Sequence, residues 1–161
     1  MPTLKNPYKP KIKRIPVTRE GFEKLKRDLE ELQKSRPEAV NNLATARAMG
    51  DLSENGLYAA AKARLRSIDS QIFRTEIQIK LADIVENISN ERVGIGSKVT
   101  IKSGETSKII SIVGDYESSP FEGKISQYSP LGKALIGRKK GEETQFNAPS
   151  GKISYTIVSI E

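Results

Sequence analysis

The sequence contains no cysteine, no histidine and no tryptophan. Without cysteine, the chain can form no disulfide bond, no thiolate metal site and no thiol nucleophile. Without histidine, it also lacks the usual general base of enzyme active sites. No apolar run approaches the roughly 18 residues that a membrane span needs, and the basic opening lacks the apolar core of a signal peptide. We therefore expect a cytoplasmic protein with no membrane partner, and we expect it to be a monomer.

The formal net charge of +7 is unevenly distributed along the 161 residues. Residues 1–14 carry five basic side chains and no acid, residues 15–90 are neutral overall, and residues 91–161 carry a net charge of +2. Prolines at positions 2, 7 and 10 favour an extended, flexible leader over residues 1–14. A basic leader can add salt-sensitive attraction to nucleic acid. It can equally serve only to keep the chain soluble, and both interpretations are open at this point.

Apolar or small residues recur at alternating steps of three and four in two long segments. This spacing is typical of helices that pack along a narrow seam, so the two segments predict an antiparallel coiled-coil hairpin over residues 15–90, with its tip at residues 50–55. We expect the first helix to run from Thr18 to Gly50, with a kink or a restart near Pro37. The second helix should continue to about Val85. The seam positions are Phe22, Leu25, Leu29, Leu32, Arg36, Ala39, Leu43 and Ala46, then Tyr58, Ala61, Leu65, Ile68, Ile72, Thr75, Ile79 and Ala82.

The helical pattern ends near residues 87–93, and short alternating runs separated by glycine-rich turns follow. They predict a small antiparallel sheet domain over residues 91–161, with a loop at 116–123. Ser129, Pro130 and Gly137 bracket a short helix as its cap, first residue and terminator. The expected fold class is therefore α+β. The expected strands cover residues 98–102, 107–113, 124–128, 143–146 and 152–160.

Three strings resemble the bacterial Gre-type transcript-cleavage factors, the GreA/GreB family, and the resemblance covers about residues 15–161. It implies a coiled-coil N-terminal domain and an FKBP-like C-terminal domain. It further implies docking on bacterial RNA polymerase, with the hairpin tip inserted into the secondary channel. The strings are Thr18-Arg19-Glu20-Gly21-Phe22-Glu23-Lys24-Leu25, Ala46-Arg47-Ala48-Met49-Gly50-Asp51-Leu52-Ser53-Glu54-Asn55 with Tyr58, and Ser129-Pro130-Leu131-Gly132-Lys133-Ala134-Leu135-Ile136-Gly137.

The family's two essential acids fall on Asp51 and Glu54. The resemblance implies that they help to hold a catalytic Mg²⁺ in the polymerase active site, and that the polymerase then cleaves the 3′ end of backtracked nascent RNA. The chain itself would not be an enzyme. Spacing alone also fits a helix-start capping box, and the two interpretations are compatible. A Gre-like regulator that does not cleave is the alternative function, but it would not need this pair of acids. A prolyl isomerase is disfavoured because the chain has no tryptophan to form the base of the usual proline-binding pocket.

The resemblance also places basic residues near the tip and a docking surface on the second domain. Arg47, Lys62 and Arg66 are the candidate contacts to the RNA phosphates, and an ordinary solvated helix face is the alternative. Tyr58 lies on the seam, so packing is its expected role. The candidate docking residues are Leu131, Gly132, Leu135 and Ile136, for which the alternative is the core face of the short helix.

Overall fold

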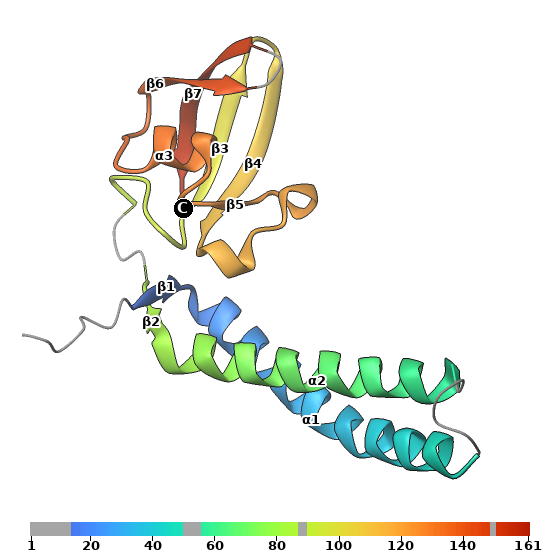
Figure 1. Ribbon diagram of the computed structural model, residues 1–161. Helices are drawn as coiled ribbons and strands as arrows, with labels where there is room; N and C mark the ends of the chain where they lie inside the picture. Colours follow the sequence, from blue (N-terminus) through green and yellow to red (C-terminus); the bar gives the residue numbers. More distant parts are fainter. Residues whose placement is uncertain (1–13, 50–55, 87–89, 149–150) are drawn as a thin grey trace, which may run out of the picture.

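A computed structural model describes residues 14–49, 56–86, 90–148 and 151–161 of the chain, and it comprises a helical hairpin and a small sheet domain (Figure 1). The α+β class predicted from the sequence is confirmed. No helix in these described ranges is long and apolar enough to cross a membrane. The elements are β1 (Ile15–Val17), α1 (Arg19–Ala48), α2 (Gly56–Leu81), β2 (Ala82–Ile84), β3 (Lys98–Ser103), β4 (Thr106–Val113), the 3-10 turns η1 (Asp115–Glu117) and η2 (Pro120–Glu122), β5 (Lys124–Ser126), α3 (Pro130–Leu135), β6 (Glu143–Ala148) and β7 (Gly151–Ile160).

The two long helices run side by side along the seam that the sequence predicts. Ala39 and Ala46 of α1 and Ile68 and Thr75 of α2 are buried, and the other seam positions except Arg36 are at least half-buried. Thr75, the polar member of the seam, donates its hydroxyl to the carbonyl of Gln71 at 2.9 Å. This hydrogen bond satisfies the buried hydroxyl, so Thr75 can occupy a position in the apolar seam.

Of the kink or restart expected near Pro37, the restart is wrong, because α1 is one continuous helix of 30 residues. Contacts on both sides of the proline hold it in helical form. Arg36 donates to the Asp69 carboxylate of α2 at 2.7 Å, and Ala39 is only 2 % exposed against the partner helix. Burial of the seam against α2 offsets the backbone hydrogen bond that Pro37 cannot make, and the half-exposed Arg36–Asp69 pair adds little.

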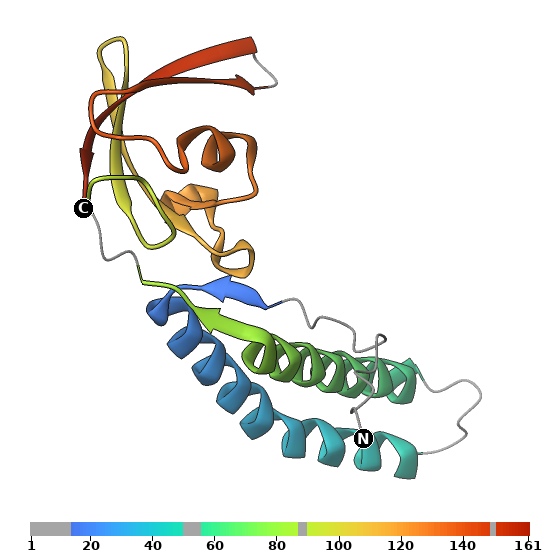
Figure 2. The same cartoon turned by 90° about the vertical axis from the view of Figure 1, so that its left-hand side faces the viewer.

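The second helix ends at Leu81, earlier than the predicted Val85, because the chain changes to a strand. β2 pairs in parallel with β1, which the sequence analysis missed, and Val17 pairs with Ile84. The amide of Val85 also donates to the carbonyl of Val17 at 2.9 Å, and Val17 is 1 % exposed. The backbone of this short pair ties the two ends of the hairpin together at its root, where the sheet domain lies (Figure 2).

The sheet domain contains five strands in the order β5-β4-β3-β7-β6. All five predicted strands are present, but β5 is short and pairs with β4 in parallel, so the expectation of a wholly antiparallel sheet is wrong. The segment predicted as a loop at 116–123 contains most of the two 3-10 turns and carries the chain back before β5 begins. The core of the domain consists of Val93, Val99, Ile101, Ile110, Ile112, Leu135, Ile157 and Ile160.

The short helix α3 forms as its sequence predicts. The Ser129 hydroxyl accepts from the amide of Gly132 at 2.9 Å, Pro130 is the first helical residue, and Gly137 follows the helix with φ of 79°. Gly132 lies so close to β5 that an added Cβ would be 2.1 Å from the carbonyl oxygen of Ser126. Glycine at this position therefore allows the helix to pack tightly on the sheet.

Candidate functional site

The free end of the hairpin is the place where the sequence predicts chemistry. The end of α1 and the start of α2 both lie at the end of the hairpin away from the sheet domain (Figures 1 and 2). Asp51 and Glu54, the two predicted metal-holding acids, belong to residues 50–55 and lie outside the described residues, as does the alternative capping box. Their roles remain predictions. The described flanks show what surrounds them.

Four cations and no acid occupy the described helical turns nearest the tip. Residues 39–49 and 56–68 contain Arg47, Lys62, Arg64 and Arg66 as their only charged side chains, and all four are exposed. None of the ion pairs within the described part of the chain involves any of these four side chains. The described distal turns of the hairpin thus present four exposed cations that make no ion pair with another described residue.

The three predicted RNA-contacting residues all lie within this distal part. Lys62 and Arg66 are one turn apart on α2, and Arg47 is in the last turn of α1. The ammonium group of Lys62 lies 5.6 Å from the ring centroid of Tyr58, an arrangement that holds the lysine by a cation–π contact. Tyr58 is half-buried, in agreement with its predicted place on the seam. Its ring therefore also positions a cation.

Charges in the half of the hairpin near the sheet domain are arranged differently, because many of them are paired. Arg36 bonds to Asp69 across the two helices, and Lys34 lies 2.6 Å from Glu30 along α1. The hydrogen bond from Lys34 lowers the pKa of Glu30, and the same contact raises the pKa of Lys34. Residues 15–38 and 69–86 together carry eight basic and ten acidic side chains, whereas residues 39–68 carry four basic and two acidic ones. The distal part of the hairpin therefore has a net positive charge and the rest of it does not.

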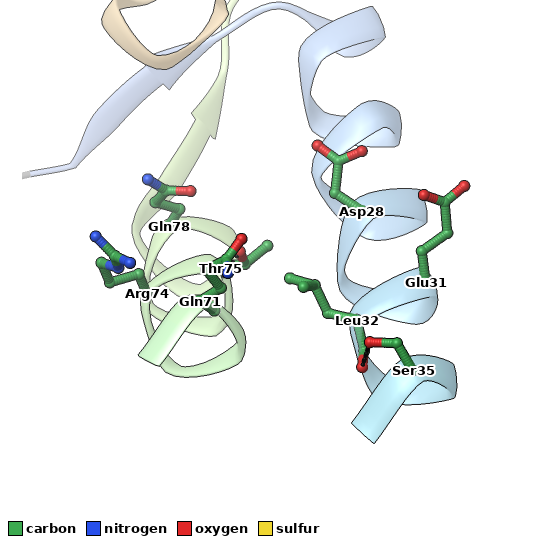
Figure 3. Close-up of a pocket in the computed structure, with 8 residues that line it drawn as sticks. All are labelled: Asp28, Glu31, Leu32, Ser35, Gln71, Arg74, Thr75 and Gln78. Atoms are coloured by element: carbon green, nitrogen blue, oxygen red, sulfur yellow. Dashed lines mark hydrogen bonds between the residues drawn. The ribbon is translucent and has the colours of Figure 1, made fainter. Parts of the chain in front are cut away.

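An open hollow of about 660 Å³ lies between the helices, halfway along the hairpin. Figure 3 shows Asp28 and Glu31 on α1, Arg74 on α2, and the Ser35 hydroxyl bonded to the Leu32 carbonyl. The lining mixes both signs of charge with amides and a buried threonine, and it contains no set of groups arranged for catalysis. We assign no site to it. The full lining is Asp28, Glu31, Leu32, Ser35, Gln71, Arg74, Thr75 and Gln78.

The chain's chemistry limits how it can hold a metal ion. Among the described residues no group of three aspartates or glutamates could hold one. Asp51 and Glu54 together offer two carboxylates, which are hard oxygen donors of the kind that Mg²⁺ prefers. Two carboxylates alone leave most of its coordination sphere to water or to another molecule. The two carboxylates are therefore the right type of ligand for magnesium but too few to hold it alone.

The predicted docking residues separate into two groups. Leu135 is fully buried in the core and Gly132 is buried against β5, so these two have the core role that the sequence left open. Ile136 is 38 % exposed, and Leu131 is half-buried beside the core. Only Ile136 and part of Leu131 are accessible to another protein, and their docking role remains a prediction.

Two exposed apolar residues at the tip escaped the sequence analysis. Met49 and Leu57 flank residues 50–55 and are 67 % and 66 % exposed. Both fall one position off the heptad seam, next to a predicted tip. That combination is the signal that could have identified them as surface residues at the end of the hairpin.

Comparison with known proteins accounts for this combination of hairpin and sheet. A family model for the N-terminal domain of transcription elongation factors matches residues 15–85, and one for the C-terminal domain of GreA/GreB matches residues 88–161. Transcription elongation factor GreA of Staphylococcus saprophyticus is 44 % identical over 154 residues, which are 92 % of this chain and 98 % of that protein. The chain belongs to the GreA/GreB family. It is a transcription elongation factor.

Other relatives extend over similar lengths. GreA of Maridesulfovibrio salexigens is 41 % identical over 150 residues, 91 % of this chain and 94 % of that protein. Among solved structures, the GreA factor homolog 1 protein of Thermus thermophilus is 28 % identical, with a TM-score of 0.44, covering 92 % of this chain and 99 % of that one. Residues 1–14 precede the family match, so the basic leader is a feature outside the shared domains.

Proposed function

We propose that this elongation factor binds RNA polymerase, inserts its hairpin tip into the secondary channel and stimulates the polymerase's own cleavage of backtracked nascent RNA. The supporting observation is that exposed cations on the distal turns of both helices flank, in sequence, the segment that contains Asp51 and Glu54. α1 alone has 30 residues and is about 45 Å long, so the tip is presented far from the sheet domain. It acts as a cytoplasmic monomer.

The acids and the cations have different roles in this proposal. Asp51 and Glu54 supply carboxylate oxygens beside the polymerase's own ligands and the RNA phosphate, and so complete a magnesium site. A magnesium ion held there would activate water and stabilise the charge that develops on the phosphate. Arg47, Lys62 and Arg66 hold the extruded RNA by its phosphates, which requires no particular base sequence. The polymerase remains the nuclease.

A non-cleaving regulator of the secondary channel is the second candidate. It would use the same reach and the same cations, but it would have no use for two carboxylates at the tip. Both acids are present in this chain. We therefore favour stimulation of cleavage over simple obstruction of the channel.

A cleavage assay on stalled complexes separates the two candidates. Labelled nascent RNA in backtracked polymerase complexes should shorten at least tenfold faster when the protein is added, consistent with the contribution of a positioned metal site. The protein alone should leave the same RNA intact. If it hydrolyses free RNA, the polymerase is not the nuclease. If it slows elongation without releasing RNA, the regulator is the correct assignment.

Removing the distal cations should weaken the hold on RNA without affecting the fold. The triple variant R47A/K62A/R66A should reduce the rate of cleavage by about tenfold at physiological salt, because three phosphate contacts are lost. The difference in cleavage rate between this variant and the parent should become smaller as the salt concentration is raised, because salt weakens phosphate contacts in the parent. The triple variant K24A/R27A/K80A removes the same charge from exposed positions nearer the root and should cleave normally. Equal losses in both variants would show that only net charge matters.

A further inference from the structure

A carboxylate of the sheet domain binds the root of the hairpin at the start of α1. Glu117, in η1, accepts a hydrogen bond from the backbone amide of Thr18 at 2.8 Å and a second from the Thr18 hydroxyl. The same hydroxyl accepts from the amide of Gly21 at 3.0 Å and so caps α1. One threonine thereby joins the first turn of the long helix to a residue 99 positions away in the chain.

Two glycines make room for this contact. A Cβ at Gly21 would be 2.1 Å from the Glu117 carboxyl carbon and 2.2 Å from one of its oxygens. A Cβ at Gly114 would be 2.3 Å from the carbonyl oxygen of Pro16. The carboxylate thus occupies the space beside Gly21, and the backbone before Thr18 passes directly against the sheet domain.

The contact has features that resist rotation. Both carboxylate oxygens of Glu117 accept hydrogen bonds from Thr18, and both bonds are partly buried. Two bonds to one residue fix the orientation of Thr18 relative to Glu117 as well as the distance between them. Its negative charge also lies at the N-terminus of α1, where the helix dipole favours it. The exposed ion pair between Lys124 and Glu20, at 3.3 Å, lies nearby but contributes little on its own.

The geometry of the arm makes the angle at this contact important. α1 extends about 45 Å from Thr18, so a rotation of roughly 10° at the root would move the tip by roughly 8 Å. Capping of α1 alone requires only the Thr18 side chain. The additional hydrogen bonds, which Glu117 accepts from Thr18, therefore act on the orientation of the hairpin relative to the sheet domain.

We propose that Glu117 is a positioning residue that fixes the direction of the hairpin relative to the sheet domain and thereby aims the tip. Its effect on RNA cleavage rests on the proposed function, whereas its effect on domain orientation does not. Gly21 is part of the same device because its missing side chain admits the carboxylate. Loss of the contact should leave each domain folded and the two domains free to change their relative angle.

Two variants break the contact by opposite routes. Glu117→Ala removes the carboxylate, and Gly21→Ala displaces it without altering any charge. Alanine is also the better helix former, so Gly21→Ala should keep α1 intact. Gly56→Ala is the matched control for orientation, because a Cβ there meets nothing within 4 Å. Glu105→Gln, at an exposed position in the β3–β4 turn, is the matched control for loss of charge.

Domain orientation can be measured directly because the chain has no native cysteine. Spin labels at Met49→Cys and Lys108→Cys report the distance from the tip to the sheet domain. Pulsed electron paramagnetic resonance should give a narrow distance distribution between the two labels for the parent and for both controls. It should broaden or shift by several ångströms in Gly21→Ala and Glu117→Ala. Unchanged circular dichroism would show that the helices persist.

Cleavage kinetics test the functional consequence in the unlabelled chain. The concentration that half-saturates polymerase should stay within twofold of the parent, while the maximal cleavage rate falls by about tenfold to a hundredfold, because a misplaced group loses its orientation. The double variant should be no worse than either single variant, since both remove one contact. An unchanged distance distribution in both single variants would overturn the proposal, as would a broadened distribution with an unchanged maximal rate. A parent protein that stimulates no cleavage would refute the proposed function, and the distance measurements would still decide the role of Glu117.

Discussion

The double variant Asp51→Asn/Glu54→Gln should lose transcript cleavage by a factor of a hundred or more while the protein stays folded. Asparagine remains a good helix N-cap and glutamine can still complete a capping box, so the pair preserves the local structure while removing both negative charges. Without carboxylates the tip no longer contributes charged ligands to magnesium. Cleavage of labelled RNA in backtracked polymerase complexes measures the loss, and helical circular dichroism checks the fold.

Two controls separate chemistry from capping. The double variant should still compete with the parent for polymerase, because the sheet domain, where we expect docking, is untouched. Each single variant should recover part of its activity when magnesium is raised, if the acids act by increasing metal occupancy. Normal cleavage by the double variant would mean that the two acids only start a helix, and the central proposal would be wrong.

Truncating Leu135 should lower the free energy of unfolding of the sheet domain by about 2–5 kcal/mol. The side chain is fully buried among the strands, so Leu135→Ala removes apolar contacts and leaves a cavity. Urea unfolding followed by circular dichroism measures the change. The sequence allowed this residue to be either core or docking surface, and its burial predicts a large effect on stability.

The neighbouring residue provides the contrast. Ile136 is 38 % exposed, so Ile136→Ala should change stability by less than about 1 kcal/mol. If Ile136 contacts polymerase, the same variant should raise the concentration needed for half-maximal cleavage by severalfold. A large loss of stability in Ile136→Ala, or a weak one in Leu135→Ala, would contradict the separation into core and surface.

The sequence by itself determined the helical hairpin, because a seam that repeats in steps of three and four over eight positions has few other ways to be buried. It also determined the short helix α3, since Ser129, Pro130 and Gly137 each occupy the position that their backbone chemistry favours. The residue pattern around Asp51 and Glu54 indicated the family and the position of its proposed site. All these features depend on contacts that are local or periodic in the chain.

Other features were decided only in the tertiary structure. Pro37 stays helical because the seam around Ala39 is buried against the partner helix, and local propensity cannot anticipate the strength of that packing. Paired residues of β1 and β2 are 67 positions apart in the chain, and each strand has only three residues, too few to show an alternating pattern. Glu117 meets Thr18 only because two domains pack together. Contacts between residues far apart in the chain depend on how separate elements are placed, and one sequence carries no periodic signal of that placement.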